Sequence, residues 1–401
     1  MNVKRRRVLY IPGYDPFHPR RYRELYRKEG AEQAGLSDYA LAQRKGDGPY
    51  SWVVDAEMEG ARVTAEVEVL VWSDIVAASM SASIAATYLQ LVRTAWTYLA
   101  SGALFRLMRL RKGPVIAALY PVGFLLAQLL VAILAGWGVW RVVEAVLPFG
   151  GTMLGVAAGL VVAALVLRWF KSKDSKVFAY YLMHDYAFSA RWGGANPPAL
   201  EARMAAFGEK VIEALNSDAD EVLVVGHSSG AHLAISVLAD LLRDGLDPAG
   251  RLSFLSLGHV VPMVSFLPNA SRLRGDLHVM GAQDVIPWVD VTAPGDGCAF
   301  ALCDPVAVSG VAPVRQTGPL ILSAAFTQTL SPARWNALKR RYFRLHFQYL
   351  CAFDALTGAP GEYDYFRVTA GPLTLAERFV ARASSPSTLR TAVNRHISMA
   401  A

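Results

Sequence analysis

Two long stretches without a charged residue constrain this chain more than any other feature. They cover residues 114–140 and 145–167, and only the short segment from Arg141 to Glu144 separates them. A helix needs about 20 apolar residues to cross the hydrocarbon core of a bilayer, so each stretch is long enough to span it. Helices buried in a soluble core are seldom this long, which favours membrane helices over core helices. The sequence therefore predicts a two-helix transmembrane hairpin over residues 113–170.

The residues around these stretches predict where the hairpin turns and how it is oriented. Residues that break or loosen a helix stand between the two hydrophobic centres: Gly136, Gly138, Pro148, Gly150 and Gly151. Basic residues precede the first stretch and follow the second: Arg106, Arg109, Arg111 and Lys112, then Arg168, Lys171, Lys173 and Lys176. Because basic flanks stay on the cytoplasmic side, both ends of the hairpin are expected there.

Residues 75–112 form a third unusual region. The part from Ile75 to Val92 is uncharged, and every charge between Val92 and residue 113 is positive. One interpretation is an amphipathic helix that lies on the lipid headgroups, with its arginines near phosphate. The other is an ordinary core or linker helix, and the wide apolar face leaves both open.

Composition supports a membrane protein and excludes several other classes. Hydrophobic residues make up 53% of the 401 residues and charged residues only 18%, which excludes a disordered chain. The net charge of +7 suits nucleic acid as well as anionic lipid, but the basic residues cluster beside the hairpin, so we expect no nucleic-acid partner. Three irregularly spaced cysteines indicate reduced thiols. Without a Cys/His cluster or a phosphate-binding glycine loop in the sequence, we expect no metal and no cofactor.

Outside the hairpin, short strand-like runs alternate with helical patterns. The expected strands are 7–11, 61–72, 177–183, 221–226, 252–257 and 288–292, and the expected helices are 197–216 and 230–242. Apolar strands separated by helices indicate a mostly parallel sheet with helices on both faces. The hairpin and residues 75–112 would thus interrupt an α/β domain formed by residues 1–74 and 171–383. Residues 384–401 are expected to form a loose tail.

The segment from Gly226 to Gly230, with the sequence GHSSG, is the strongest indication of chemistry. It follows an apolar strand and precedes a helix rich in small residues, which is the setting that a G-x-S-x-G nucleophile turn requires. Ser228 must stand on a strained turn that exposes its hydroxyl, and the glycines leave room where side chains would collide. The helix behind the turn directs its positive end at a developing oxyanion. Ser228 is therefore predicted to be a nucleophile, with an inert turn as the alternative.

With this motif the chain resembles the α/β-hydrolase superfamily of lipases, esterases and thioesterases, over roughly residues 1–72 and 177–370. The resemblance implies that an acid and then a histidine follow the serine in the chain. Two candidates compete for the acid, and Asp296, after the better strand, is favoured over Asp284, whose Gly-x-x-Asp-x-x-Pro segment is similar to the family's acid loop.

The base must follow the acid, which leaves His346 and His396. His346 lies in an ordered aromatic segment and is favoured, because His396 falls in the expected tail. The resemblance further implies an oxyanion hole made by the backbone N–H groups of Ser229 and Tyr14.

Three further residues are expected near the substrate. Gly13 precedes Tyr14 in the loop after the first strand, His227 stands beside the nucleophile, and His259 ends a later strand. We predict that these residues line the pocket.

A cytoplasmic serine hydrolase held by a membrane hairpin would meet substrates dissolved in the bilayer. We therefore expect a membrane-bound lipase or esterase that cleaves glycerolipids, with diacylglycerol first and phospholipid or lysophospholipid next. The choice of diacylglycerol, like the expected location in a bacterial inner membrane, rests on a resemblance to membrane-associated bacterial lipases. The alternatives are a thioesterase or peptidase of the same fold, or a non-catalytic membrane scaffold. The membrane insertion falls between early strands, where the family does not place its caps, so no lid is inferred.

Overall fold

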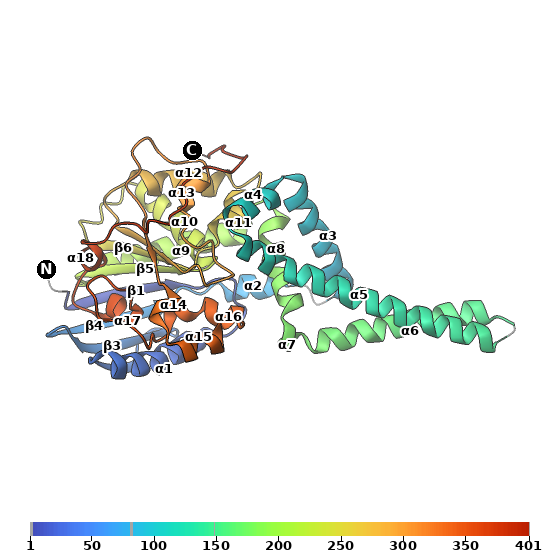
Figure 1. Ribbon diagram of the computed structural model, residues 1–401. Helices are drawn as coiled ribbons and strands as arrows, with labels where there is room; N and C mark the ends of the chain where they lie inside the picture. Colours follow the sequence, from blue (N-terminus) through green and yellow to red (C-terminus); the bar gives the residue numbers. More distant parts are fainter. Residues whose placement is uncertain (1–2, 81–82, 148, 401) are drawn as a thin grey trace.

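An eight-stranded sheet forms the centre of the computed structural model, which describes residues 3–80, 83–147 and 149–400 (Figure 1). The strands are β1 (Arg5–Ile11), β2 (Ala40–Lys45), β3 (Ser51–Met58), β4 (Ala61–Val69), β5 (Glu221–His227), β6 (Leu252–Leu257), β7 (Trp288–Thr292) and β8 (Leu320–Ser323). Their order across the sheet is β2-β3-β4-β1-β5-β6-β7-β8. Only the β2–β3 and β3–β4 pairs are antiparallel. The protein is therefore α/β with a mostly parallel sheet, as the sequence predicts.

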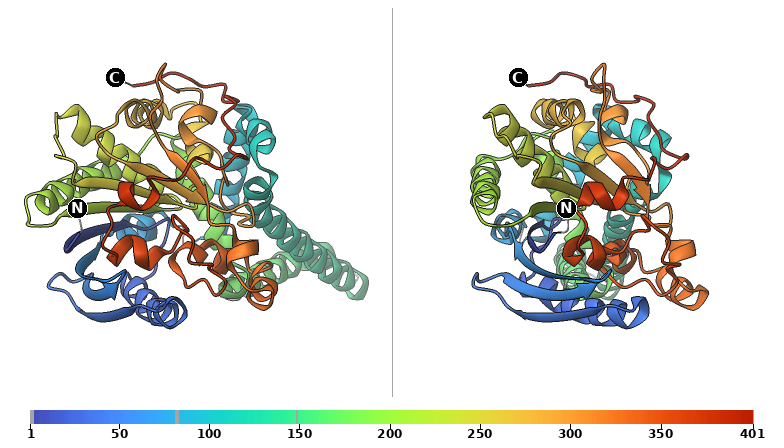
Figure 2. Two further views of the ribbon diagram at one scale, coloured as in Figure 1. Left: turned by 60° about the vertical axis from the view of Figure 1, so that its left-hand side comes forward. Right: turned by 90° about the vertical axis from the view of Figure 1, so that its left-hand side faces the viewer.

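Helices cover both faces of this sheet (Figure 2). In β1, Val8 and Tyr10 pack on one face and Leu9 and Ile11 on the other, and all four are buried. This alternation, with both sides apolar, is what a strand buried on both faces requires. The first face carries α1 (Arg20–Ser37), α14 (Phe326–Thr329), α15 (Pro332–Leu338), α16 (Tyr342–His346), the 3₁₀ turn η1 (Gln348–Leu350), α17 (Tyr365–Ala370) and α18 (Leu375–Phe379). The second carries α2 (Ser73–Ser79), α9 (Pro198–Leu215), α10 (Gly230–Arg243), α11 (Val261–Ser265), α12 (Ser271–Ala282) and α13 (Pro305–Val308).

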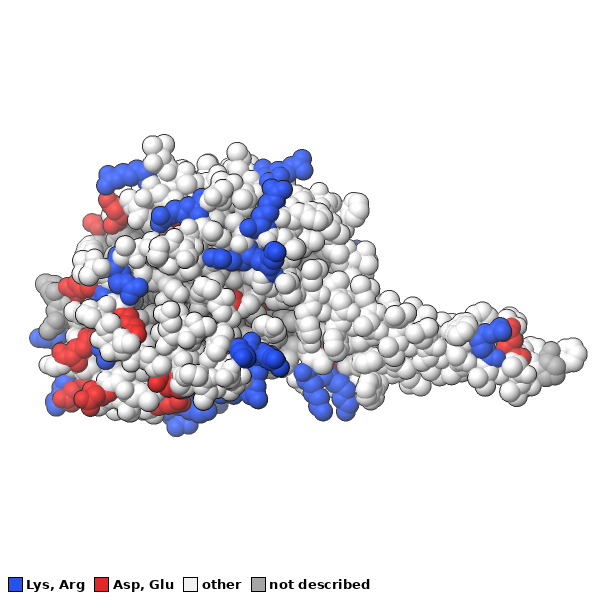
Figure 3. Space-filling model, viewed as in Figure 1, with Lys and Arg blue, Asp and Glu red and all other residues white. Residues whose placement is uncertain are grey.

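Between β4 and β5 the chain leaves the sheet and forms a long helical insertion. After α2 it comprises α3 (Ile84–Ala100), α4 (Ala103–Leu110), α5 (Lys112–Val146), α6 (Gly151–Ser172), α7 (Asp174–Val177) and α8 (Ala179–Arg191). Helices α5 and α6 lie side by side and project from the body as a rod whose visible face is almost free of charged side chains (Figures 1 and 3). Both are long and apolar enough to cross a membrane. Near the tip, Arg141 and Glu144 form an ion pair of 2.6 Å.

The hairpin turns later than the sequence predicts. Helix α5 continues to Val146 and α6 begins at Gly151, so Gly136 and Gly138 lie inside α5, while Pro148 lies outside the described residues. Gly136 serves a different purpose, because a Cβ there would lie 2.6 Å from the carbonyl oxygen of Gly159 in α6. Small residues allow two membrane helices to approach this closely.

One local prediction was wrong, and two strands were not predicted. Residues 177–183, expected as a strand, fall in α7 and α8. Asp174 accepts hydrogen bonds from the backbone N–H groups of Tyr180 and Tyr181 and so satisfies the start of α8. Four residues of the apolar run that suggests a strand are buried in this helix, namely Ala179, Tyr180, Leu182 and Met183. The sequence also gave no sign of β2 and β3, which form the antiparallel edge of the sheet.

The C-terminal segment is not loose over residues 384–400. It contains no helix, but the backbone N–H of Leu389 donates to the carbonyl oxygen of Leu302, and that of Ala400 donates to Ser271. The guanidinium of buried Arg274 donates to the carbonyl oxygen of Ser398. A polar, serine-rich segment can be held this way by its backbone, which composition alone does not reveal.

Residues 75–112 are helical in α2, α3 and α4 over the part that the structure describes. Helix α3 packs on α8, and buried Tyr98 donates a hydrogen bond to the carbonyl oxygen of Met263. Its other side leaves Val92 and Trp96 exposed, at 61% and 72% of their surface. An apolar face of this kind lies open on the same insertion as the hairpin.

Candidate active site

Ser228 occupies a sharp turn between β5 and α10. Its φ is +57°, a left-handed conformation that costs a non-glycine residue about 1–3 kcal/mol. The flanking residues must be glycines, because a side chain at either position would collide with neighbouring backbone. A Cβ at Gly226 would lie 2.7 Å from the Cα of Ala231, and a Cβ at Gly230 would collide with the carbonyl oxygen of Ile11. The turn therefore holds the serine where β1, β5 and α10 meet.

Asp296 and His346 are brought together although 50 residues separate them. Nδ1 of His346 donates to Oδ2 of Asp296 over 2.7 Å, and both residues are buried. Two further groups donate to the same carboxylate, the hydroxyl of Tyr349 at 3.0 Å and the backbone N–H of Cys298 at 2.9 Å. Burial raises the pKa of Asp296, but the charge of His346 and these hydrogen bonds outweigh it and hold the pKa below its ordinary value. The carboxylate therefore stays ionised and fixes the orientation of the imidazole.

His227 holds the backbone of His346 in place. Its Nε2 donates to the carbonyl oxygen of His346 over 3.0 Å, and the centres of the two rings lie 4.9 Å apart. Burial, together with the charge of His346, lowers the pKa of His227 to about 3. His227 is thus a neutral hydrogen-bond donor beside the site.

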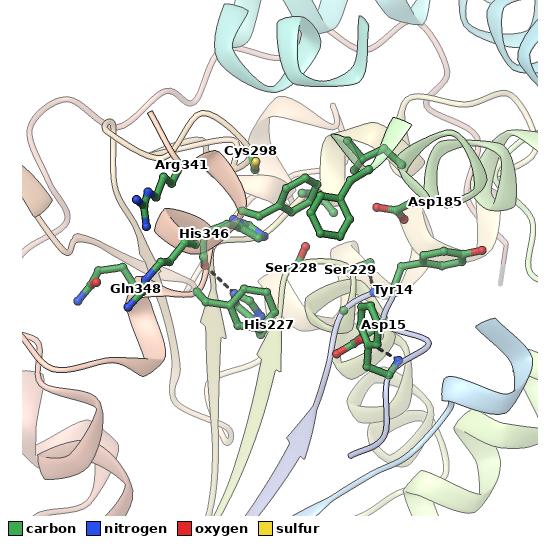
Figure 4. Close-up of a pocket in the computed structure, with 18 of the residues that line it drawn as sticks. Tyr14, Asp15, Asp185, His227, Ser228, Ser229, Cys298, Arg341, His346 and Gln348 are labelled. Atoms are coloured by element: carbon green, nitrogen blue, oxygen red, sulfur yellow. Dashed lines mark hydrogen bonds between the residues drawn. The ribbon is translucent and has the colours of Figure 1, made fainter. Parts of the chain in front are cut away.

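Ser228 and His346 line the same cavity from neighbouring sides (Figure 4). The buried Nε2 of His346 forms no hydrogen bond within the described part of the chain. The other ring nitrogen, Nδ1, donates its hydrogen bond to Asp296, so Nε2 is the nitrogen that can accept a proton. No hydrogen bond joins the serine Oγ to it. In unliganded sites such contacts are often long and tighten when substrate binds.

The loop after β1 lies against the serine. A Cβ at Gly13 would be 3.0 Å from Cβ and 3.4 Å from Oγ of Ser228, so glycine keeps this side open. The backbone N–H of Tyr14 points toward the turn, but it donates to Oγ of Ser229 over 2.8 Å. One of the two expected oxyanion donors is therefore already engaged with the side chain of the residue that was expected to supply the other.

Two candidates from the sequence lie away from this cluster. Asp284 is exposed and precedes β7, at the opposite end of the strand from Asp296. His259, expected in the pocket, does not line the cavity. Gly258 takes a φ of +53° and turns the chain, and Nε2 of His259 lies 3.1 Å from the carbonyl oxygen of Cys303. Gly13 and His227 do line it. His396 lies in the C-terminal segment and not in the cavity wall.

The cavity has a volume of about 940 Å³ and two different ends. Helix α8 supplies one wall, with Tyr181, Leu182, Asp185, Tyr186 and Ser189. Tyr98 of α3 and Pro114 of α5 extend it. The other end is formed by α1 and by the segment from α15 to α16, and it carries charged side chains. The cavity thus joins the serine both to the root of the hairpin and to a charged opening.

Asp185 is the site residue that the sequence reasoning missed. Its carboxyl lies in the cavity wall, and burial raises its pKa to about 7, with the charge of His346 acting in the opposite direction. The sequence predicts a strand for part of this segment, over residues 177–183. Read as a helix, Phe178, Tyr181, Leu182 and Asp185 follow the i, i+3, i+4, i+7 spacing of one face, which would have aligned the carboxylate with the other cavity residues.

One group of side chains has metal-ligand chemistry. Donor atoms of Asp296, Cys298 and His346 lie within 4.8 Å of one another. The carboxylate already accepts the imidazole N–H, and burial, aided by the charges of Asp296 and Asp185, raises the pKa of the Cys298 thiol well above its ordinary value. Metal binding needs a thiolate, so this arrangement favours a hydrogen-bonded acid–base pair.

Comparisons with known proteins give no relative. A scan against family models, a search of curated proteins and a search of solved structures each find no match to this chain.

Proposed function

We propose that this protein is a membrane-bound serine hydrolase of the α/β-hydrolase type that cleaves acyl esters of glycerolipids. One observation carries the proposal. Ser228, on a strained strand-to-helix turn, shares a cavity with His346. Nδ1 of this histidine is hydrogen-bonded to the buried, ionised carboxylate of Asp296. An activated serine needs these three roles in this arrangement.

The geometry supports a two-step reaction. His346 Nε2 takes the proton from Ser228 Oγ as the oxygen attacks the acyl carbonyl, and Asp296 stabilises the imidazolium that forms. The ester C–O bond then breaks, and the alcohol leaves with that proton. Water, deprotonated by His346, next cleaves the acyl-serine bond, which releases the fatty acid and restores Ser228. The oxyanion would lie near the backbone N–H of Ser229, at the start of α10, with Tyr14 beside it.

The position of the cavity supports a substrate drawn from the bilayer. Its α8 wall follows α7 and α6 directly in the chain, and α3 and α5 contribute to the same wall. An acyl chain could therefore enter from the root of the hairpin. We further propose that basic residues on both sides of the hairpin place the catalytic body on the cytoplasmic face of a bacterial inner membrane, with the apolar side of α3 on the same surface.

A panel of matched acyl substrates tests the proposal. The full chain in nonionic detergent would be assayed on an ester, a thioester and a peptide that carry the same acyl chain, beside the Ser228→Ala variant. We expect ester cleavage that the variant loses. Preferred cleavage of the thioester or peptide would change the reaction class, and a folded wild-type protein inert to all three would support a non-catalytic scaffold.

A further inference from the structure

The charged end of the cavity holds more cations than its own acids can pair. Five basic residues line this end: Arg21, Lys28, Arg334, Arg341 and Arg344. Each acid lining the same end has a cation within 3.4 Å: Asp15 with Arg21, Glu24 with Arg27, and Glu29 and Glu32 with Arg334. Lys28, Arg341 and Arg344 form no ion pair with any described residue, so three positive charges remain available at the opening.

The opposite end of the cavity is unfavourable for an anion, because Asp185 lines it, and favourable for an apolar group, because its other residues are mostly apolar. Figure 4 shows Asp185 and Arg341 on opposite sides of Ser228. Around Asp185 the wall is aromatic and aliphatic, with Tyr98, Leu182, Tyr186 and Met263 among its residues. A bound substrate is therefore given a direction. Its negative group belongs at the arginine end and its hydrocarbon at the α8 end, with the serine between them.

The basic end also lies next to the membrane side of the body. Phe343, between the two arginines in the chain, contacts Phe178 and Tyr181 with ring centres 5.5 and 6.2 Å apart. Phe178 directly follows α7, the short helix that leads out of the hairpin. Lys173 and Lys176 flank the same connection. A lipid headgroup in the adjoining leaflet would reach this opening without leaving the membrane surface.

We infer that Lys28, Arg341 and Arg344 bind the phosphate of a lipid headgroup, so that the substrate is an anionic glycerophospholipid and not a neutral acylglycerol. Arginine suits this role because its planar guanidinium can bind two phosphate oxygens at once. The inference rests on the proposed serine hydrolase, since it places the scissile ester between this headgroup site and the α8 wall. An acyl thioester on a phosphate-bearing soluble carrier has the same chemistry, but the position beside the hairpin favours the membrane source.

The experiment compares two lipids that differ only in the headgroup, together with a soluble phosphate-bearing thioester. The full chain in nonionic mixed micelles would be given phosphatidylglycerol, diacylglycerol or acyl-coenzyme A with the same acyl chain, at fixed ionic strength. The Arg341→Gln/Arg344→Gln variant removes two of the three cations of the headgroup site. Arg340→Gln is the matched control, because Arg340 precedes the pair, is exposed and does not line the cavity. Thermal unfolding in the same detergent checks that each variant is folded.

We expect the wild type to prefer phosphatidylglycerol. The double variant should lose about tenfold or more in kcat/KM on that lipid while keeping its rate on diacylglycerol, and the control should match wild type on both. Equal use of the two lipids, or equal losses on both in the double variant, would overturn the headgroup site. A preference for acyl-coenzyme A would overturn the membrane source. Retained hydrolysis in Ser228→Ala would instead refute the serine mechanism on which the inference rests, so the two failures are distinguishable.

Discussion

The α/β body buries its apolar side chains, whereas the hairpin leaves many of them exposed. In the body, β5 and β6 are buried along their whole length, while on the hairpin Leu130 and Leu160 leave more than half of their surface exposed. Water would penalise the second pattern, and a bilayer would not. The body builds its site from residues far apart in the chain, whereas the hairpin depends on local composition and on close helix contact. The proposed function thus assigns chemistry to the body and membrane location to the hairpin, so each can be perturbed without the other.

The largest expected effect separates the two candidate acids of the body. Asp296→Asn should lower kcat/KM for ester hydrolysis by roughly 10³–10⁴-fold, because the imidazole loses the anion that orients it. Asp284→Asn, at the far end of β7, should leave the rate unchanged. Steady-state rates on a soluble short-chain ester would measure both. Similar rates in the two variants would remove Asp296 from the mechanism.

The hairpin offers a matched pair of its own. Gly136→Leu forces a side chain into the backbone of α6, so we expect a loss of about 1–3 kcal/mol in stability. Gly138→Leu lies in open space on the same helix and should show no such loss. Thermal unfolding in detergent would compare them, and hydrolysis of a soluble ester should be unchanged in both. A loss of soluble-ester activity in Gly136→Leu alone would show that the hairpin does more than anchor the proposed hydrolase.

Asp185 links the two regions, because it lies in the cavity wall on the helix that follows the hairpin. Its folded pKa of about 7 exceeds the ordinary 3.8, so the folded state binds an extra proton between these values. This contribution to stability is complete below pH 4 and is lost as pH rises through 7. Asp185→Asn should therefore unfold at a higher temperature than wild type at pH 8, with a smaller gain at pH 5.

Other ionisable side chains interact electrostatically with Asp185, namely His346, Tyr14, Tyr98, Tyr181, Tyr186 and Cys298. They are present in both proteins, so the difference between the two unfolding curves reports on Asp185. A difference that does not change between pH 5 and pH 8 would contradict the raised pKa.

The smallest effect concerns the oxyanion hole. Ser229→Ala removes the hydroxyl that accepts the N–H of Tyr14 and leaves that N–H free for the substrate. We expect kcat to stay within about tenfold of wild type, with any change being a gain. A loss of roughly 10²–10³-fold would show that the Ser229 hydroxyl itself donates to the oxyanion. Single-turnover acylation would measure the step directly.

Local features made the hairpin and the serine turn predictable, and long-range ones did not. Membrane helices depend on composition over some 20 residues, and the turn at Ser228 on a few residues in a fixed setting. Asp296 and His346 could be ranked by neighbouring strand and aromatic context, and the structure brings them together. Asp185 was missed because an apolar run fits a strand or a helix equally well at that length. His259 does not line the cavity as predicted, because Gly258, just before it, takes a left-handed conformation that changes the direction of the chain.

The proposed headgroup site shows the same limit of sequence-based prediction. Arg341 and Arg344 line the same cavity as Lys28 because α16 and α1 lie on the same face of the sheet, although more than 300 residues separate them in the chain. Which cations remain unpaired depends on where each acid finds its partner, and the sequence does not show this. The net charge alone predicts only a general attraction to anionic lipid.

The central claim is that Ser228 is an activated nucleophile, and covalent labelling tests it most directly. Membranes containing the full chain would be treated with a fluorescent fluorophosphonate, with Ser228→Ala and Ser229→Ala as the variant and its neighbouring control. The account predicts labelling of wild type and Ser229→Ala and none of Ser228→Ala. Labelling that persists in Ser228→Ala, or a folded wild-type protein that does not label, would contradict it.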